Sequence, residues 1–167
     1  NIKQVVFHMQ WSNTGDYLDG CCFAFSSHDN CEEKISYEWT YSCVVGDGAI
    51  THNGDQRGKQ TLSVDLRKLN QNIKHLVFTL SAYDAPSIKD FVNPGFSMYD
   101  QSKPNVSLCS CAVAQVQLQS IILCSLTRDN QGVWNVIRIA KESMGNMKSE
   151  WELHKTIKGI LANLNMK

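Results

Sequence analysis

The polar segment of residues 52–58 carries side chains well suited to bind a ligand. Asp55 places a carboxylate in this turn, between Gly54 and Gly58, and the apolar residues of 61–66 then alternate with polar ones. Calcium ions take about six to eight oxygen ligands, mostly carboxylates and carbonyls on flexible loops. Two roles fit the aspartate: it holds a cation, or it accepts backbone N–H groups and shapes the turn.

The cysteines are the second group of reactive side chains. The chain has seven of them, an odd number, whereas disulfide-stapled domains are shorter and have even counts. We therefore expect reduced thiols in the core of a cytoplasmic protein. The sequon at Asn105 keeps secretion open, because such a triplet matters only in a secreted protein. The sequence contains no Cys-x-x-Cys pair, which is the spacing typical of a zinc site. The cysteines are Cys21, Cys22, Cys31, Cys43, Cys109, Cys111 and Cys124.

Several function classes have little support. The five histidines belong to no nucleophile signature, and His52 in the polar turn is expected to bond to backbone, so we expect no enzyme. Sixteen basic and sixteen acidic residues cancel, which leaves no overall field to gather nucleic acid. No apolar run approaches the roughly 20 residues that span a bilayer, so no membrane span is expected.

Short strands account for most of the chain. In residues 75–83, Leu76, Phe78, Leu80 and Ala82 alternate with the residues of the other face, which is typical of a half-buried strand. Polar turns separate the strands, and this spacing favours a sandwich or barrel over alternating βαβ units. Turns are predicted at 12–15, 46–48, 52–58 and 93–95. Further strands are predicted at 5–11, 23–25, 38–44, 62–66, 121–126 and 133–139.

The C-terminal region changes to a helical period. Ser149 and Glu152 have capping-box spacing, and apolar residues then recur at helical intervals, so a helix is predicted at about 149–164. Its expected role is to close the core, with partner binding as the alternative. A shorter helical turn is expected at 86–91. No linker or internal repeat divides the sequence, so residues 1–167 are expected to form a single domain.

Three segments together resemble the TerD domain of tellurium-resistance and stress-response proteins. They are residues 17–23, the turn at 52–58 and residues 80–84. The resemblance implies an all-β dominated fold, an antiparallel β-sandwich of two sheets with the C-terminal helix packed on it. The downstream half resembles the divergent eukaryotic branch of the family, through residues 78–83, 86–88, 93–94, 108–109 and 121–128.

The resemblance also implies metal ligands. Bacterial members of the family have paired calcium sites, built from an Asp-Leu-Asp stretch and from a turn that leads into an acidic run. Here Tyr17 replaces one of the two aspartates, and Lys59 begins the segment where the acidic run is missing. Asp16 is adjacent to Tyr17 in the sequence, but its side chain is expected to point in a different direction. The candidate Ca²⁺ ligands are Asp19, Asp55 and Asp84; the alternative is that these aspartates only form turns and caps.

The expected function is a non-enzymatic binding or scaffold domain of the TerD type, calcium-binding and stress-associated. The alternative is a calcium-independent module for protein interaction or self-assembly, with contacts made through exposed sheet edges. Either function implies protein partners or self-association. A cysteine-based redox enzyme is the third class considered, and its thiols would need a lowered pKa.

Overall fold

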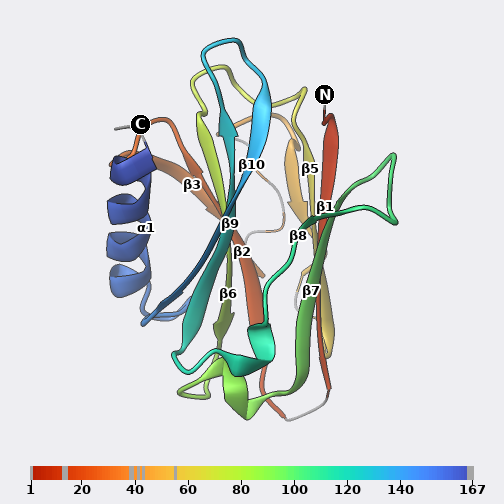
Figure 1. The fold of residues 1–167 in the computed structure, drawn as a ribbon, viewed down its shortest axis with the longest axis vertical. Coiled ribbons are helices and arrows are strands. Elements are labelled where there is room, and N and C mark those ends of the chain that lie inside the picture. The colour runs from red at the N-terminus through yellow and green to blue at the C-terminus, as the bar shows by residue number, and fades with distance from the viewer. Residues whose placement is uncertain are drawn as a thin grey trace.

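Two five-stranded sheets lie face to face and enclose the main core (Figure 1). The computed structural model describes residues 2–12, 15–37, 40, 42, 44–54 and 56–164. Neighbouring strands pair antiparallel in both sheets. The strand order is β4-β5-β1-β7-β8 in the first sheet and β10-β9-β6-β2-β3 in the second. This arrangement confirms the predicted antiparallel β-sandwich.

The strands of each sheet come from distant parts of the chain. The first sheet contains β4 (Ile50–His52), β5 (Lys59–Asp65), β1 (Gln4–Ser12), β7 (Val92–Asp100) and β8 (Ser107–Cys109). The second contains β10 (Trp134–Ser143), β9 (Ser120–Arg128), β6 (His75–Ala82), β2 (Leu18–Phe25) and β3 (Cys31–Ile35). The helical elements are η1 (Ile88–Asp90), η2 (Val113–Gln115) and α1 (Trp151–Leu164).

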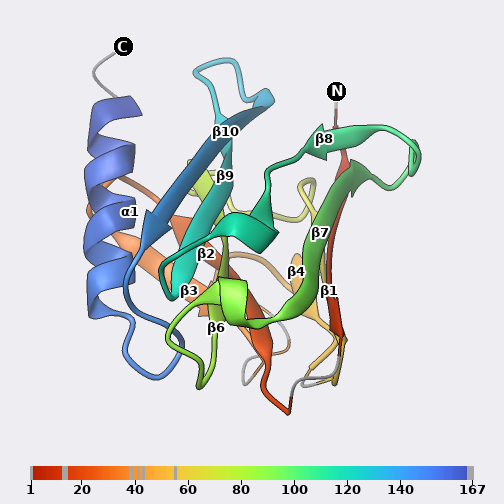
Figure 2. The same ribbon diagram turned by 60° about the horizontal axis from the view of Figure 1, so that its bottom comes forward.

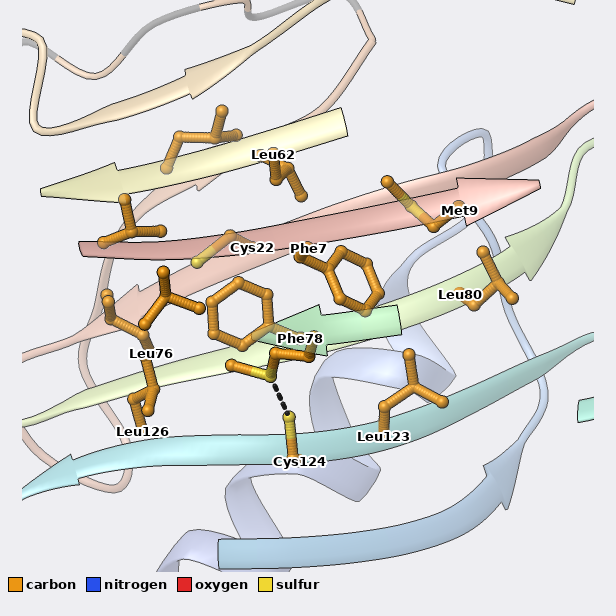
Figure 3. Close-up of a cluster of buried hydrophobic side chains, with 14 of the residues drawn as sticks. Phe7, Met9, Cys22, Leu62, Leu76, Phe78, Leu80, Leu123, Cys124 and Leu126 are labelled. Atoms are coloured by element: carbon orange, nitrogen blue, oxygen red, sulfur yellow. Dashed lines mark hydrogen bonds between the residues drawn. The ribbon is translucent and has the colours of Figure 1, made fainter. Parts of the chain in front are cut away.

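The main core is formed by the alternating apolar residues of both sheets. In β1, Phe7 and Met9 are fully buried in the main core, where Phe7 lies next to Phe78 of β6 (Figure 3). The rings of Phe7 and Phe78 lie 5.4 Å apart between centroids. The two-residue period of a strand places every second side chain on this inner face. The strand predicted in residues 75–83 is therefore present, but it is not half-buried as expected, because every residue of β6 is buried.

Helix α1 covers the outer face of the second sheet (Figures 1 and 2). Leu153, Ile157 and Leu161 are fully buried on this face, against Phe23 and Phe25 of β2. The central strands β2 and β6 are therefore buried on both faces. The helix predicted at about 149–164 is confirmed within two residues, and so is its packing on the sandwich. Among the described residues, no helix is long and apolar enough to cross a membrane.

One predicted turn is wrong. Residues 93–95 lie inside β7, although their sequence has the composition of a turn. Pro94 lacks an N–H donor, but this part of β7 pairs with β1 only, because β8 pairs with β7 at Met98 and Tyr99. Asn93 has φ of 50°, beside the register shift between Gln10 and Ser12 of β1. The segment is therefore an irregular part of a strand.

Two further predictions on local structure have different outcomes. The short helical turn expected at 86–91 is present as η1. The strand expected at 38–44 falls largely outside the described residues, and the three described residues inside it, Thr40, Ser42 and Val44, belong to no strand.

The packing of α1 predicts a pH dependence. The His154 ring lies 5.0 Å from the Phe23 ring, and burial lowers the pKa of this imidazole. An unfolded histidine has a pKa of about 6.5, so below that pH the unfolded chain binds more protons than the folded one. The free energy of unfolding should therefore fall as the pH drops from 7 through 6.5. Urea denaturation at pH 7 and pH 5.5 measures this change.

The substitution His154→Gln provides the control, because it removes the titrating ring. The variant should lose less stability between these pH values than the parent. His75, whose pKa is also lowered by burial, contributes to the part that remains. An identical pH dependence in parent and variant would contradict the role given to His154.

Candidate functional site

Three aspartates lie at one end of the sandwich, which we call the aspartate end: Asp16, Asp19 and Asp84. Strands β2 and β6 pair antiparallel, so the start of β2 meets the end of β6 (Figure 2). The Tyr83 N–H donates to the carbonyl oxygen of Tyr17 at 3.0 Å and extends this pairing. Two of the predicted ligands, Asp19 and Asp84, are thereby brought to the same end of the fold.

Asp16 connects the two chain segments at this end. Its carboxylate accepts hydrogen bonds from the backbone N–H groups of Tyr17 at 2.7 Å, Asp84 at 3.1 Å and Ala85 at 2.8 Å. Its carbonyl oxygen accepts a hydrogen bond from the Trp11 indole at 3.1 Å. Asp16 thus has the capping role that the sequence analysis held open for the other aspartates.

Asp19 is buried, with 2% of its surface exposed. It lines a cavity of about 100 Å³ together with three aromatic side chains, Tyr17, Tyr37 and Tyr83. The tyrosines are each half-buried, so the cavity lies close to the surface. The Tyr37 and Tyr83 rings are 5.8 Å apart between centroids and stand at 89° to each other. A buried carboxylate thus lies in an aromatic environment.

Asp84 is exposed and pairs with a lysine from the other end of the sequence. Its carboxylate accepts a hydrogen bond from the Lys148 ammonium, and this bond raises the pKa of Lys148. The same ammonium lies 3.9 Å from the centroid of the Tyr83 ring. The cation bound to Asp84 is therefore a lysine side chain of the protein itself.

The loop before α1 positions Lys148. The buried Asn146 side chain donates to the carbonyl oxygens of Ala82 at 3.1 Å and Tyr83 at 2.9 Å. Its own oxygen accepts the N–H groups of Lys148 and Ser149, each at 3.0 Å. Sequence reasoning missed the roles of Asn146, Lys148, Tyr37 and Tyr83, because no local spacing relates residue 37 or residues 146–148 to the end of β6.

The turn at residues 52–58 lies beside the aspartate end. The Arg57 guanidinium donates to the Tyr17 hydroxyl at 3.1 Å. His52 is buried and accepts the Gly54 N–H on Nδ1 at 2.9 Å, which confirms its expected bond to the backbone. Asp55, the third predicted metal ligand, lies outside the described residues. The described part of the turn thus brings a cation to the aspartate end.

The described residues at this end do not fit a calcium ion by themselves. Calcium takes about six to eight oxygen ligands, whereas the Asp16 carboxylate is used by backbone N–H groups and Asp84 by Lys148. Asp19 lines a cavity whose other described lining residues are tyrosines. In the part of the chain that the structure describes, no three His, Cys, Asp or Glu side chains converge as metal ligands.

The six described cysteines are free thiols, as predicted, and Cys43 lies outside the described residues. Burial raises the pKa of the Cys21 and Cys22 thiols. A hydrogen bond with Cys124 lowers the pKa of Cys109 to about 7, but only 6% of Cys109 is exposed. The thiol with the lowered pKa is therefore shielded from reagents in solution.

A larger hollow lies away from the aspartate end. It has a volume of about 510 Å³ and lies between the loop after β5 and the turn that joins β9 to β10. Its walls include Arg67, Lys74, Arg128 and Asp129, and the Arg128 guanidinium lies 4.5 Å from the centroid of the Trp134 ring. This hollow contains none of the side chains predicted to bind a ligand.

Comparison with known proteins places the chain in a family. A model of the TerD domain matches residues 1–149, whereas no curated protein matches the chain. A homologue of the telluride resistance protein TerD from Streptomyces coelicolor A3(2) has a similar fold. Its TM-score is 0.73 at 13% identity, over 89% of this chain and 94% of that one. A protein of unknown function, SAV2460, also has a similar fold, with a TM-score of 0.68 and 17% sequence identity. The match covers 86% of this chain and 92% of SAV2460. The chain belongs to the TerD domain family.

Proposed function

We propose that this TerD domain is a non-enzymatic binding or scaffold domain whose ligand site is the aspartate end, and that it works without calcium. The observation that carries the proposal is the Lys148 ammonium bound to Asp84 and to the face of Tyr83. A positively charged side chain thus lies beside one of the carboxylates that the family resemblance assigns to calcium.

The number of available oxygen ligands matters more than the strength of this ion pair. The side chains of Lys148 and Asp84 are 44% and 66% exposed, and an exposed pair contributes only about 0–1 kcal/mol. Calcium could displace such a lysine if enough other oxygens were at hand. However, Asp16 is held by three backbone N–H groups, and Arg57 adds a second cation beside Tyr17.

Structural contacts of four of the five histidines support a non-enzymatic function. His52 accepts a backbone N–H, His8 contacts the Thr61 hydroxyl at 3.1 Å, and His75 contacts the Thr127 hydroxyl at 3.0 Å. The fourth, His154, packs on the Phe23 ring under α1. These contacts hold strands and the helix together, and none of them pairs a histidine with a thiol or a carboxylate.

Exposed apolar side chains beside the aspartate end support a protein partner. Trp151 at the start of α1 is 70% exposed and Met144, just before the Asn146 loop, is 49% exposed. Tryptophan and methionine are enriched in protein interfaces. The alternative route to self-assembly is through the edge strands β3, β4, β8 and β10, which each pair on one side only within the described residues.

Calcium titration tests the proposal. A ligand that binds only the folded state raises stability by mass action, by about 2.7 kcal/mol at a hundredfold excess over its dissociation constant. We expect the melting temperature of the chelator-treated protein to stay unchanged when millimolar calcium is added. A clear rise that Asp84→Ala abolishes would contradict calcium independence.

A further inference from the structure

The cavity at the aspartate end has a composition that selects a particular class of ligand. Among the described residues that line it, three are tyrosines and the fourth is Asp19, whose carboxylate is buried. The face of an aromatic ring carries partial negative charge and attracts cations within about 6 Å of its centroid. An anionic group and three aromatic rings around one small space therefore favour a positively charged occupant.

The arrangement of the rings supports a cation with apolar substituents. Tyr37 and Tyr83 both line the cavity, and their rings stand perpendicular to each other. Tyr17 comes from the start of β2, and its hydroxyl is fixed by Arg57 at 3.1 Å. A strongly hydrated metal ion would lose its water against such walls without gaining enough oxygen ligands. An alkylated ammonium group contacts aromatic faces through its alkyl groups and needs no directional ligands.

The chain already shows that one of these rings accepts an ammonium. The Lys148 ammonium lies 3.9 Å from the Tyr83 centroid, inside the range of a cation–π contact. The volume of about 100 Å³ limits the size of the occupant. At about 30 Å³ for each liquid water molecule, the space suits a small head group and excludes a nucleotide or an extended ring system.

We propose that Tyr17, Tyr37, Tyr83 and Asp19 form an aromatic cage that binds an N-methylated ammonium group. This inference rests on the proposed function, since it names the ligand class of the same site. The tyrosines supply the cation–π contacts, and the buried Asp19 carboxylate supplies the opposite charge. The ammonium belongs either to a methylated lysine of a partner protein or to a free quaternary amine.

The test is a titration of the full chain with tetramethylammonium chloride. The NMR chemical shifts of the backbone amides are measured at each concentration. Potassium chloride at equal ionic strength serves as the salt control. We expect saturable binding of tetramethylammonium in the millimolar range or tighter, with the shifts centred on residues 17–19 and 83. An absence of saturable binding would overturn the proposal.

Variants separate the cage from a general effect of charge. Tyr37→Phe keeps the aromatic face and should bind as the parent does, whereas Tyr37→Leu should bind about 5–30-fold more weakly if the lost contact equals one desolvated cation–π interaction. Asp19→Asn should weaken binding at least as much, if the variant folds. Tyr99→Leu, at a half-buried tyrosine of β7, is the matched control and should leave the affinity for tetramethylammonium unchanged. Equal binding by Tyr37→Leu and the parent would overturn the cage.

Further titrations identify the source of the ammonium. A peptide with trimethyllysine that binds more tightly than choline, while its unmodified form does not bind, would assign the cage to a protein partner. Equal binding of choline would assign it to a free amine. Failure of the cage is distinguishable from failure of the proposed function: a calcium-dependent rise in melting temperature contradicts calcium independence, whereas missing ammonium binding overturns only the cage.

Discussion

Truncation of the chain after Met147 is expected to destabilise the domain by several kcal/mol. The deletion removes Leu153, Ile157 and Leu161, which are fully buried on the second sheet. Burial of one large apolar side chain contributes about 1.5–3 kcal/mol. The whole free energy of unfolding of a typical protein is about 5–15 kcal/mol. Thermal unfolding followed by circular dichroism should therefore show a large fall in melting temperature or loss of the cooperative transition.

A single substitution tests the same packing in a chain that still folds. Ile157→Ala should cost about 2–5 kcal/mol, because it removes buried methyl groups and leaves a cavity against β2. Trp151→Ala is the matched control on the same helix, since its side chain is 70% exposed and its change should stay within about 0.5 kcal/mol. A truncated protein that melts like the parent would show that α1 is an appendage.

Asn146→Ala is expected to have the second large effect. The substitution removes the donor that satisfies the carbonyl oxygens of Ala82 and Tyr83, and a buried polar group left unpaired costs about 1–3 kcal/mol. It also removes the acceptor for the N–H groups of Lys148 and Ser149. The loop before α1 should therefore loosen, and urea denaturation should show the loss of stability.

Two comparisons give this prediction its specificity. Asn146→Asp keeps an acceptor for the two N–H groups but cannot donate to the carbonyls, so it should also destabilise the domain. Asn135→Ala removes an exposed amide that donates to Asp129 and Val133, and should have little effect. Equal stability of Asn146→Ala and Asn135→Ala would contradict the role of Asn146.

The parts of the fold that the sequence predicts well are those with a clear period. Residues 75–83 alternate strictly, and β6 is a strand over almost the same span. The apolar residues of the C-terminal region recur at helical intervals, and α1 buries three of them on the sheet. In both cases, periodicity is a local signal of the secondary structure, although β6 is buried on both faces and not on one, because α1 packs on its outer side.

Other elements of the fold depend on contacts that local patterns do not encode. Residues 93–95 have turn composition, yet pairing with β1 holds them in a strand. Strand β2 begins at Leu18, five residues before the strand predicted at 23–25, because pairing with β6 extends through Asp19 and Gly20. Position 20 of β2 requires a glycine because the Met9 side chain packs against it. A Cβ at Gly20 would lie 1.6 Å from the Met9 sulfur.

The candidate site was predictable only in part. The family resemblance indicates Asp19 and Asp84, and the structure brings both to the aspartate end. The partners that determine their chemistry come from elsewhere: Tyr37 follows β3, and Lys148 is 64 residues from Asp84. Such contacts arise from sheet pairing and from the docking of α1, so spacing along the sequence could not show them.

Equilibrium dialysis of the chelator-treated protein against calcium would test the central claim most directly, because it counts bound ions. With the aspartate end held by Lys148, Arg57 and backbone N–H groups, we expect no calcium bound above background at about 1 mM free ion, a level at which even weak extracellular calcium modules bind. One or two calcium ions per chain, lost in Asp19→Asn or Asp84→Ala, would contradict the account and restore the metal site implied by the family resemblance.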